Sequence, residues 1–215
     1  MNGNIVIAID GASASGKSTN AKNVARALGF IHVDTGAMFR TLAWYCLKTG
    51  VDVHDTKAVA AVCGRWNAKL DSDGHSIRLL VDGHFPGPEI RTAEVSEATP
   101  LVAKVATARE WMKATQRRCL QFGNLVMEGR DIGTHIFPEA QFKFFLDASL
   151  SERAKRRAAQ GIRENIAARD EHDTRRTTAP LKIAPDAILI NNSHLTAAQT
   201  TALILERVKT ELAPA

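Results

Sequence analysis

A glycine-rich segment near the start of the chain has the residue types and spacing of a phosphate-binding loop. Residues 11–18 read GASASGKS and fit GxxxxGK[ST] without a mismatch. The segment follows an apolar run at residues 5–10 and precedes residues 18–28, whose spacing predicts a helix. Backbone N–H groups of such a loop and the helix N-terminus bind a polyphosphate, with Lys17 on the β and γ phosphates and Ser18 on Mg²⁺. The predicted nucleotide-binding residues are Gly11, Ala12, Ser13, Ala14, Ser15, Gly16, Lys17, Ser18 and Thr19.

Two further segments bring polar side chains to the ends of predicted strands. DTGAMFR at residues 34–40 follows one apolar run and contains Arg40, and EGRDIGT at residues 128–134 follows another and contains Arg130. The carboxyl ends of parallel strands form the ligand-binding edge of an α/β sheet. GTPase signatures such as NKxD and DxxG are absent from their expected places, and no strand ends in the DE pair of helicase-type ATPases. These observations favour a small-molecule kinase.

The elements that must position these residues are short apolar strands alternating with helices. Strands are predicted at residues 5–10, 30–34, 125–128, 142–147 and 187–190, and helices at 18–28, 36–49, 56–66, 102–120, 151–160 and 196–212. This alternation predicts an α/β fold with a mainly parallel sheet. Asp73-Gly74 lies between alternating segments, which predicts a hairpin. The hairpin interrupts the alternation and indicates an insertion from about residue 40 to residue 100.

Composition limits the class of protein. The chain has 215 residues, 45% of them hydrophobic and 24% charged, which fits one large domain or a core with small insertions. No apolar run approaches the roughly 20 residues of a membrane span, and no secretory signal is recognised, so a cytoplasmic location is expected. The three cysteines are far apart and form no CxxC pair, so we expect buried thiols.

Positive charge is concentrated in one segment. Residues 151–182 contain nine Lys or Arg side chains and five acidic ones, which accounts for most of the net charge of +5. Such a segment indicates a specific anionic partner, a nucleic-acid surface or a solvated helix.

Several sequence blocks, taken in order, resemble the bacterial cytidylate kinases, the (d)CMP kinases of the nucleoside monophosphate kinase family. The blocks are IDGASASGKST, DTGAMFR, GPEIRTAEV, EGRDIGT, FPEA with KFFLDAS, SERAKRR, and RDEHDTRRTTAPL. The resemblance implies a P-loop NTPase core with a five-stranded parallel sheet, an inserted domain that binds the nucleoside monophosphate (NMP), and a lid. The core would comprise residues 1–39 and 101–215 with the lid at about 151–176, and the NMP-binding domain residues 40–100.

The resemblance also assigns roles to residues at matching positions. Thr35 and Arg40 would hold the CMP phosphate with the help of Arg130. The other residues expected to bind CMP are Arg109, Arg176 and Asp131 at the base, and Arg169 and Asp173 at the ribose. Arg153 and Arg157 would contact the transferring phosphates, with Arg156 as a further candidate beside them. The residues expected to take part in catalysis are Lys17, Arg130, Arg153 and Arg157.

Three positions depart from the family pattern. Phe39 stands where a tyrosine is common, and Pro100 stands where a serine usually helps to read cytosine. The lid is short, because only residues 158–170 separate the SERAKRR block from the EHDTRR block. These departures concern base discrimination and lid closure rather than the class of reaction.

The predicted reaction is transfer of the γ-phosphate of ATP to CMP or dCMP by a monomeric enzyme that uses Mg²⁺ with ATP. The acceptor phosphate has a second pKa near 6, so no general base is required. Neither nucleic acid nor a membrane is an expected partner. One alternative is another small P-loop kinase, similar to adenylate or shikimate kinase. The other is a basic nucleic-acid-binding module, which the interspersed acids and the lack of stacking aromatics in the basic segment disfavour.

Overall fold

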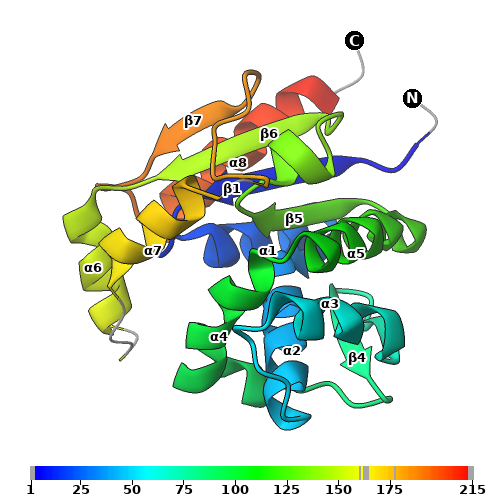
Figure 1. The fold of residues 1–215 in the computed structure, drawn as a ribbon. Coiled ribbons are helices and arrows are strands. Elements are labelled where there is room, and N and C mark those ends of the chain that lie inside the picture. Colours follow the sequence, from blue (N-terminus) through cyan, green and yellow to red (C-terminus); the bar gives the residue numbers. More distant parts are fainter. Residues whose placement is uncertain (1–2, 160, 162–164, 177, 213–215) are drawn as a thin grey trace. The chain divides into compact units, whose positions relative to one another are not determined.

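A computed structural model describes residues 3–159, 161, 165–176 and 178–212 (Figure 1). The chain divides into two units, a core unit of residues 1–32 and 123–215 and a second unit of residues 33–122. Both ends of the expected insertion, residues 40–100, fall inside the second unit, and its role as an NMP-binding domain stays a prediction. Residues 160 and 162–164 of the expected lid lie outside the described residues.

The core unit contains the predicted strands and the helices between them. Its elements are β1 (Val6–Gly11), α1 (Lys17–Leu28), β2 (Ile31–Asp34, at the boundary with the second unit), β5 (Leu125–Gly129), a π-helical turn (Ile132–Ile136), β6 (Phe142–Asp147), α6 (Leu150–Ala159), α7 (Ile166–Thr174), β7 (Ile188–Asn191) and α8 (Ala197–Leu212). Helix α1 ends at Gly29, whose φ of +68° allows its N–H to bond back to the last turn. The predicted strands are therefore present, with ends that differ by one residue or so.

The strands follow the order β3-β4-β2-β5-β1-β6-β7. Strand β1 pairs in parallel with both β5 and β6, and β6 pairs in parallel with β7. The order contains seven strands, so the expectation of five was too low. The two additional strands are those of the hairpin, β3 and β4.

One face of the sheet in the core unit is covered by α1 and α8, which lie side by side (Figure 1). Apolar side chains from both helices and from four strands form a continuous buried cluster: Ile7, Ile9, Ala21, Val24, Ala25, Val126, Phe142, Phe144, Leu146, Ile190, Ile204 and Val208. Strands β1, β5 and β6 are buried along nearly their whole length, as expected for parallel strands covered by helices. This core holds the carboxyl ends of the strands, and the loops that follow them, in place.

The second unit is mainly helical with one hairpin. Its elements are α2 (Thr35–Lys48), α3 (Thr56–Arg65), β3 (Ala68–Ser72), β4 (Ser76–Val81), a 3₁₀ turn (Glu89–Arg91), α4 (Ala93–Ala103), α5 (Ala106–Arg118) and a 3₁₀ turn (Cys119–Phe122). The predicted hairpin is confirmed: β3 and β4 pair antiparallel, and the Asp73 carboxylate accepts hydrogen bonds from the N–H groups of His75 and Ser76 across the turn.

The long helix predicted for residues 102–120 was wrong in its extent. The chain forms two helices there, α4 and α5, which are separated at Lys104 and Val105. Val102 and Ala103 belong to the end of α4, where both are buried. The sequence pattern assigns these two residues to the following helix, because both helices have buried residues at similar spacing.

Within the described residues, no helix has the length and apolar character needed to cross a membrane.

Candidate active site

The predicted phosphate loop connects β1 to α1 and has the backbone conformation that its glycines allow. Gly11 and Gly16 have φ values of +149° and +90°, and Ala14 also lies in the left-handed region at +58°. A Cβ atom on Gly11 would collide with the carbonyl oxygen of Leu146 on the neighbouring strand β6. Only glycine therefore fits where the loop leaves the sheet. The loop leads directly into the first turn of α1, whose N-terminus favours anions.

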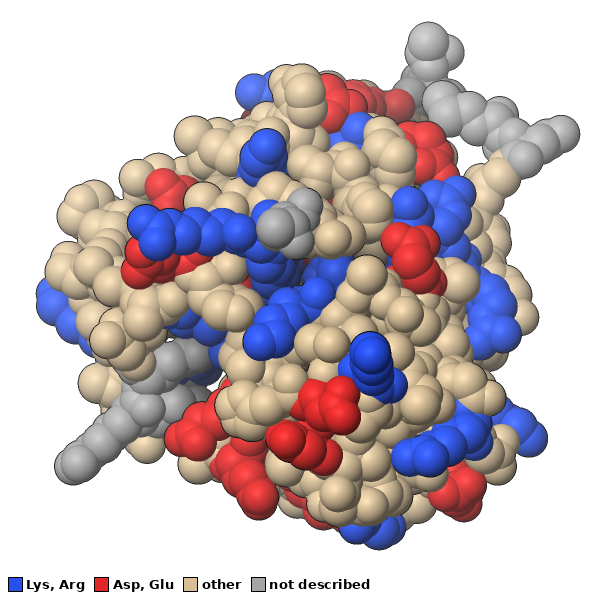
Figure 2. All heavy atoms as spheres, in the orientation of Figure 1, with Lys and Arg blue, Asp and Glu red and all other residues tan. Residues whose placement is uncertain are grey.

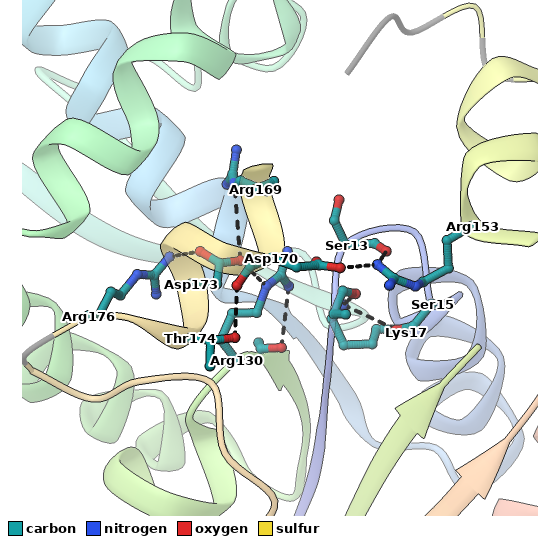
Figure 3. Close-up of polar contacts among 12 residues, drawn as sticks. Ser13, Ser15, Lys17, Arg130, Arg153, Arg169, Asp170, Asp173, Thr174 and Arg176 are labelled. Carbon is teal, nitrogen blue, oxygen red and sulfur yellow. Dashed lines mark hydrogen bonds and ion pairs between the residues drawn. The ribbon is translucent and has the colours of Figure 1, made fainter. Parts of the chain in front are cut away.

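Lys17 is buried at the base of this loop. Its Nζ donates to the carbonyl oxygen of Ala12 at 2.6 Å and lies 3.4 Å from Oγ of Ser15 (Figure 3). Burial, followed by the positive charge of Arg130, lowers the pKa of Lys17 to about 7, while Glu128 and Asp10 act in the opposite direction. The Lys17 amino group is thus held inside the loop by two neutral acceptors.

A buried carboxylate, Glu128, belongs to the next-to-last residue of β5 and lies beside the loop. His32 Nε2 lies 3.7 Å from its Oε1. Burial alone would raise the pKa of Glu128, but contact with His32, the charge of Lys17 and a hydrogen bond from Ser18 hold it below its usual value. An ionised carboxylate and a hydroxyl therefore meet at the start of α1, and both are oxygen donors of the kind that Mg²⁺ prefers.

Two arginines of α6 contact the phosphate loop. Arg153 donates from Nη1 to the carbonyl oxygen of Ser13 at 3.2 Å and to Oδ2 of Asp170 at 2.5 Å (Figure 3). Arg157 donates from Nη2 to Oγ of Ser13 at 3.1 Å. The structure thus places both predicted residues at the loop. It also shows that Asp170, which the sequence did not single out, pairs with one of them.

Arg156 is anchored differently. Its guanidinium donates to the side-chain and main-chain oxygens of Asn192 at 3.1 and 2.8 Å, and Asn192 Nδ2 donates to the carbonyl oxygen of Ser15 at 2.8 Å. Asn192 follows β7 at the same edge of the sheet and is buried. It links α6 to the phosphate loop, and no motif in the sequence indicated it.

Asp173 on α7 lies among three of the predicted arginines. Arg130 Nε donates to its Oδ2 at 2.8 Å, Arg169 Nε lies 3.8 Å from the same oxygen, and Arg176 Nη2 donates to Oδ1. Figure 3 shows the arginines around the carboxylate, with Asp170 on the same helix turned toward Arg153. The carboxylate is fully buried. The guanidinium groups hold the pKa of Asp173 below its usual value although burial opposes this.

The second unit carries three more of the predicted residues, whereas Asp131 is buried in the core unit. Thr35 is the buried first residue of α2, after Asp34, whose carboxylate accepts a hydrogen bond from Ala37 N. Arg40 on α2 donates to Oγ of Ser96 at 2.7 Å.

Arg109 on α5 is buried in the same unit. It donates to the carbonyl oxygen of Ala103 at 3.2 Å, and its guanidinium lies over the Phe39 ring at 5.6 Å from the centroid. Phe39, which lacks the hydroxyl common at this position, thus packs against a residue predicted to read the base.

A comparison of the whole chain with known proteins identifies its family. The family model for cytidylate kinase matches residues 7–210. The chain belongs to the cytidylate kinase family. The cytidylate kinase of Geobacillus kaustophilus is 42% identical over 97% of this chain and 98% of that protein. The cytidylate kinase of Caldanaerobacter subterraneus is 37% identical over 97% of this chain and 96% of that protein.

Among solved structures, the kinase is similar to TT1252 from Thermus thermophilus. The TM-score is 0.50 at 18% sequence identity, and the match covers 99% of this chain and 100% of that one. At this identity the likeness concerns the fold alone. Membership of the cytidylate kinase family makes the protein an ATP-dependent phosphotransferase.

Proposed function

We propose that this kinase transfers the γ-phosphoryl group of ATP to CMP or dCMP, producing ADP and CDP or dCDP. The observation that carries the proposal is the arrangement around the phosphate loop, where Lys17, Arg153 and Arg157 all contact loop atoms within the core unit. Family membership supports the choice of CMP as the acceptor.

The chemistry requires positioning and charge rather than a base. The phosphate of CMP has a second pKa near 6 and is largely dianionic at neutral pH, so its oxygen can attack without losing a proton to the protein. The difficulty is to hold two polyanions in line while negative charge spreads over the transferring phosphoryl group. Arginine suits this task, because its planar guanidinium can donate to two phosphate oxygens at once.

Lys17, Arg130, Arg153 and Arg157 are the residues proposed to supply this charge. The lysine and the two α6 arginines now donate to carbonyl or hydroxyl oxygens of the phosphate loop. These neutral acceptors keep the cationic groups in place and can be exchanged for phosphate oxygens, which are stronger acceptors because they are charged. The remaining loop residues, Gly11 to Thr19, would surround the ATP phosphates with backbone N–H groups.

Ser18 is proposed to hold the Mg²⁺ that accompanies ATP, with Glu128 beside it. The fit rests on the buried, ionised carboxylate of Glu128, which receives a hydrogen bond from the Ser18 hydroxyl. When bound, the ion neutralises negative charge on the β and γ phosphates. The Glu128 carboxylate is buried, whereas Ser18 is exposed at the start of α1.

Residues of both units are proposed to bind CMP. Thr35 and Arg40, with Arg130, would bind the phosphate. The residues proposed for the nucleoside are Arg109, Arg176 and Asp131 for the base, and Arg169 and Asp173 for the ribose. Asp173 already binds three arginines, so a ribose hydroxyl would add to an existing charged network.

The test is an assay of ADP release with ATP and a panel of acceptors: CMP, dCMP, UMP, AMP, GMP and shikimate. CMP and dCMP are expected to give the highest kcat/KM. Preference for AMP or shikimate would overturn the proposal in favour of an adenylate- or shikimate-kinase-like activity.

We also propose that the protein acts as a cytoplasmic monomer without nucleic acid. On the face drawn in Figure 2, acidic side chains lie among the basic ones, which does not favour a continuous phosphate-backbone surface. Sedimentation of the purified protein with and without a mixed-sequence oligonucleotide tests the oligomeric state and the absence of nucleic-acid binding.

A further inference from the structure

Asp10, the residue before the first glycine of the phosphate loop, makes an unusual pair of contacts. It is 5% exposed at the end of β1. One carboxylate oxygen accepts a hydrogen bond from Ile132 N at 2.9 Å, and the other accepts one from Gly133 N at 2.8 Å. These two amides belong to the segment that directly follows Arg130 and Asp131. Asp10 therefore joins the phosphate loop to the segment that carries two predicted acceptor-binding residues.

The local backbone explains why these amides need a side-chain acceptor. Asp10 and Gly129 are paired in register, and β5 ends at Gly129. A π-helical turn begins at Ile132, and the first N–H groups of any helical turn lack acceptors within it. The two oxygens of one carboxylate satisfy both amides, whereas an asparagine side chain has only one acceptor oxygen.

Keeping this carboxylate ionised is costly for the fold. Burial and the neighbouring Asp131 raise the pKa of Asp10 to about 6, although the two amides and the charge of Lys17 act against the rise. Lys143 on β6 also borders Gly133, but its ammonium group is bound to Asp186 and to the carbonyl oxygen of Pro138. A neutral residue would avoid the burial penalty but would not satisfy both amides.

We propose that Asp10 is a positioning residue that fixes Arg130 and Asp131 for the acceptor nucleotide. Its carboxylate binds the backbone amides of the two residues that directly follow them, so that the Arg130 guanidinium and the Asp131 carboxylate leave the sheet in one defined direction. The inference rests on the proposed function, because it takes Arg130 and Asp131 to bind CMP. It assigns to Asp10 a role in acceptor binding and not in ATP binding.

The experiment compares Asp10→Asn with the wild-type protein. The variant keeps the size of the side chain but leaves one of the two amides facing an NH₂ group. The kcat/KM for CMP is expected to fall about 10- to 100-fold, while the dissociation constant of ADP, measured by calorimetry, changes less than about threefold. An equal loss of ADP affinity and CMP use would overturn the proposal. If Asp10→Asn does not fold, Asp10→Ser, which also has a single side-chain oxygen, is compared in the same way.

Asn124→Ala is the matched control. Asn124 Oδ1 accepts a hydrogen bond from Ile5 N at 2.8 Å, so it joins the same pair of strands, β1 and β5, at their opposite ends. The substitution removes a similar bond without touching the segment after β5. The kcat/KM for CMP is expected to stay within about twofold of wild type. A loss as large as that of Asp10→Asn would show that weakening the pairing of β1 with β5 is enough to lower the kcat/KM for CMP, and the proposal would fail.

A mutant cycle that removes both positioned side chains separates positioning from general destabilisation. If Asp10 acts through Arg130 and Asp131, adding Asp10→Asn to the Arg130→Ala/Asp131→Asn variant should lower the kcat/KM for CMP by less than about threefold. Additive losses would refute the proposal.

Amide hydrogen exchange separates failure of this inference from failure of the proposed function. Exchange at Ile132 and Gly133 should be slow in wild type and faster in Asp10→Asn, whichever nucleotide is the acceptor. Unchanged exchange would overturn the clamp itself. Faster exchange in a protein that does not phosphorylate CMP would confirm the clamp while refuting the proposed acceptor.

Discussion

Replacing Asp173 with asparagine tests how the arginine cluster of the core unit is held together. The side chain is 0% exposed, and its oxygens face guanidinium groups of Arg130, Arg169 and Arg176. Asparagine preserves the shape but removes the charge, so three cations would lose the carboxylate that pairs with all of them. We expect Asp173→Asn to lower stability even before nucleotides are added.

The size of the effect follows from burial. Removing one partner of a buried ion pair costs about 3–5 kcal/mol, because the other partner is left without compensation. The arginine side chains are 20%, 17% and 8% exposed, so water replaces part of the lost pairing and the lower value of about 3 kcal/mol applies. For a chain of this length, Tm should fall by about 6–12 °C.

The assay is thermal unfolding at about pH 7, with Glu171→Gln as the control. Glu171 lies on the same helix and pairs with Arg175 at 2.8 Å, but the two side chains are 56% and 80% exposed. An exposed pair of this kind contributes under about 1 kcal/mol, so Tm should change little. If Asp173→Asn unfolds no earlier than Glu171→Gln, the reasoning about the buried carboxylate is refuted.

The pH dependence gives a second check on the same residue. The arginines hold the pKa of Asp173 below its usual value, so its contribution to stability is fully present above the unfolded pKa of about 4. It is lost as pH falls through the lowered folded pKa. The difference in unfolding free energy between wild type and Asp173→Asn, measured in urea, should therefore shrink below about pH 4. A difference that stays constant into acid would assign the loss to something other than this charge.

Four other substitutions test the site. Lys17→Ala should lower kcat about 100-fold or more with an unchanged circular dichroism spectrum, and undiminished turnover by the folded variant would exclude Lys17 from catalysis. Arg40→Ala and Arg130→Ala should each reduce CMP phosphorylation but preserve slow ATP hydrolysis in the absence of CMP; equal loss of both activities would place these arginines on the wrong substrate. Pro100→Ser should raise the ratio of kcat/KM for CMP to that for UMP about two- to twelvefold, because a hydroxyl can accept from the cytosine amino group and proline offers no such acceptor. A ratio unmoved by Pro100→Ser but lost in Asp131→Asn would show that the carboxylate alone reads the base.

The phosphate loop and its flanking elements could be predicted because the information is local. Glycines at fixed spacing, Lys17 and Ser18 lie within a few residues of one another, and the loop conformation follows from φ values that glycine tolerates. The hairpin at Asp73-Gly74 was predictable for the same reason, since the Asp73 side chain bonds to amides two and three residues ahead. The sequence pattern did not locate the boundary between α4 and α5, because the apolar residues at the end of α4 continue into α5 with similar spacing.

The pairing of carboxylates with arginines could not be predicted in this way. Asp170 and Asp173 are part of a charge-rich segment that is equally compatible with a solvated helix. Their role depends on α7 bringing them to α6 and to the end of β5, as the contacts with Arg153 and Arg130 show. Asn192 likewise gains its contact with the phosphate loop only because β7 ends beside β6.

The class of fold, the phosphate loop and the residue types available for phosphoryl transfer can be predicted from the amino-acid sequence, because strand alternation and glycine spacing act over short stretches of chain. The set of charged groups that are buried together depends on the folded chain. Asp10 and the amides it binds are more than 120 residues apart, and Arg130 and Asp173 are 43 apart. Such pairs form when the packed sheet brings distant strand ends together and removes water from them. Burial then determines the pKa values and contacts of these groups, and a linear pattern carries no measure of burial.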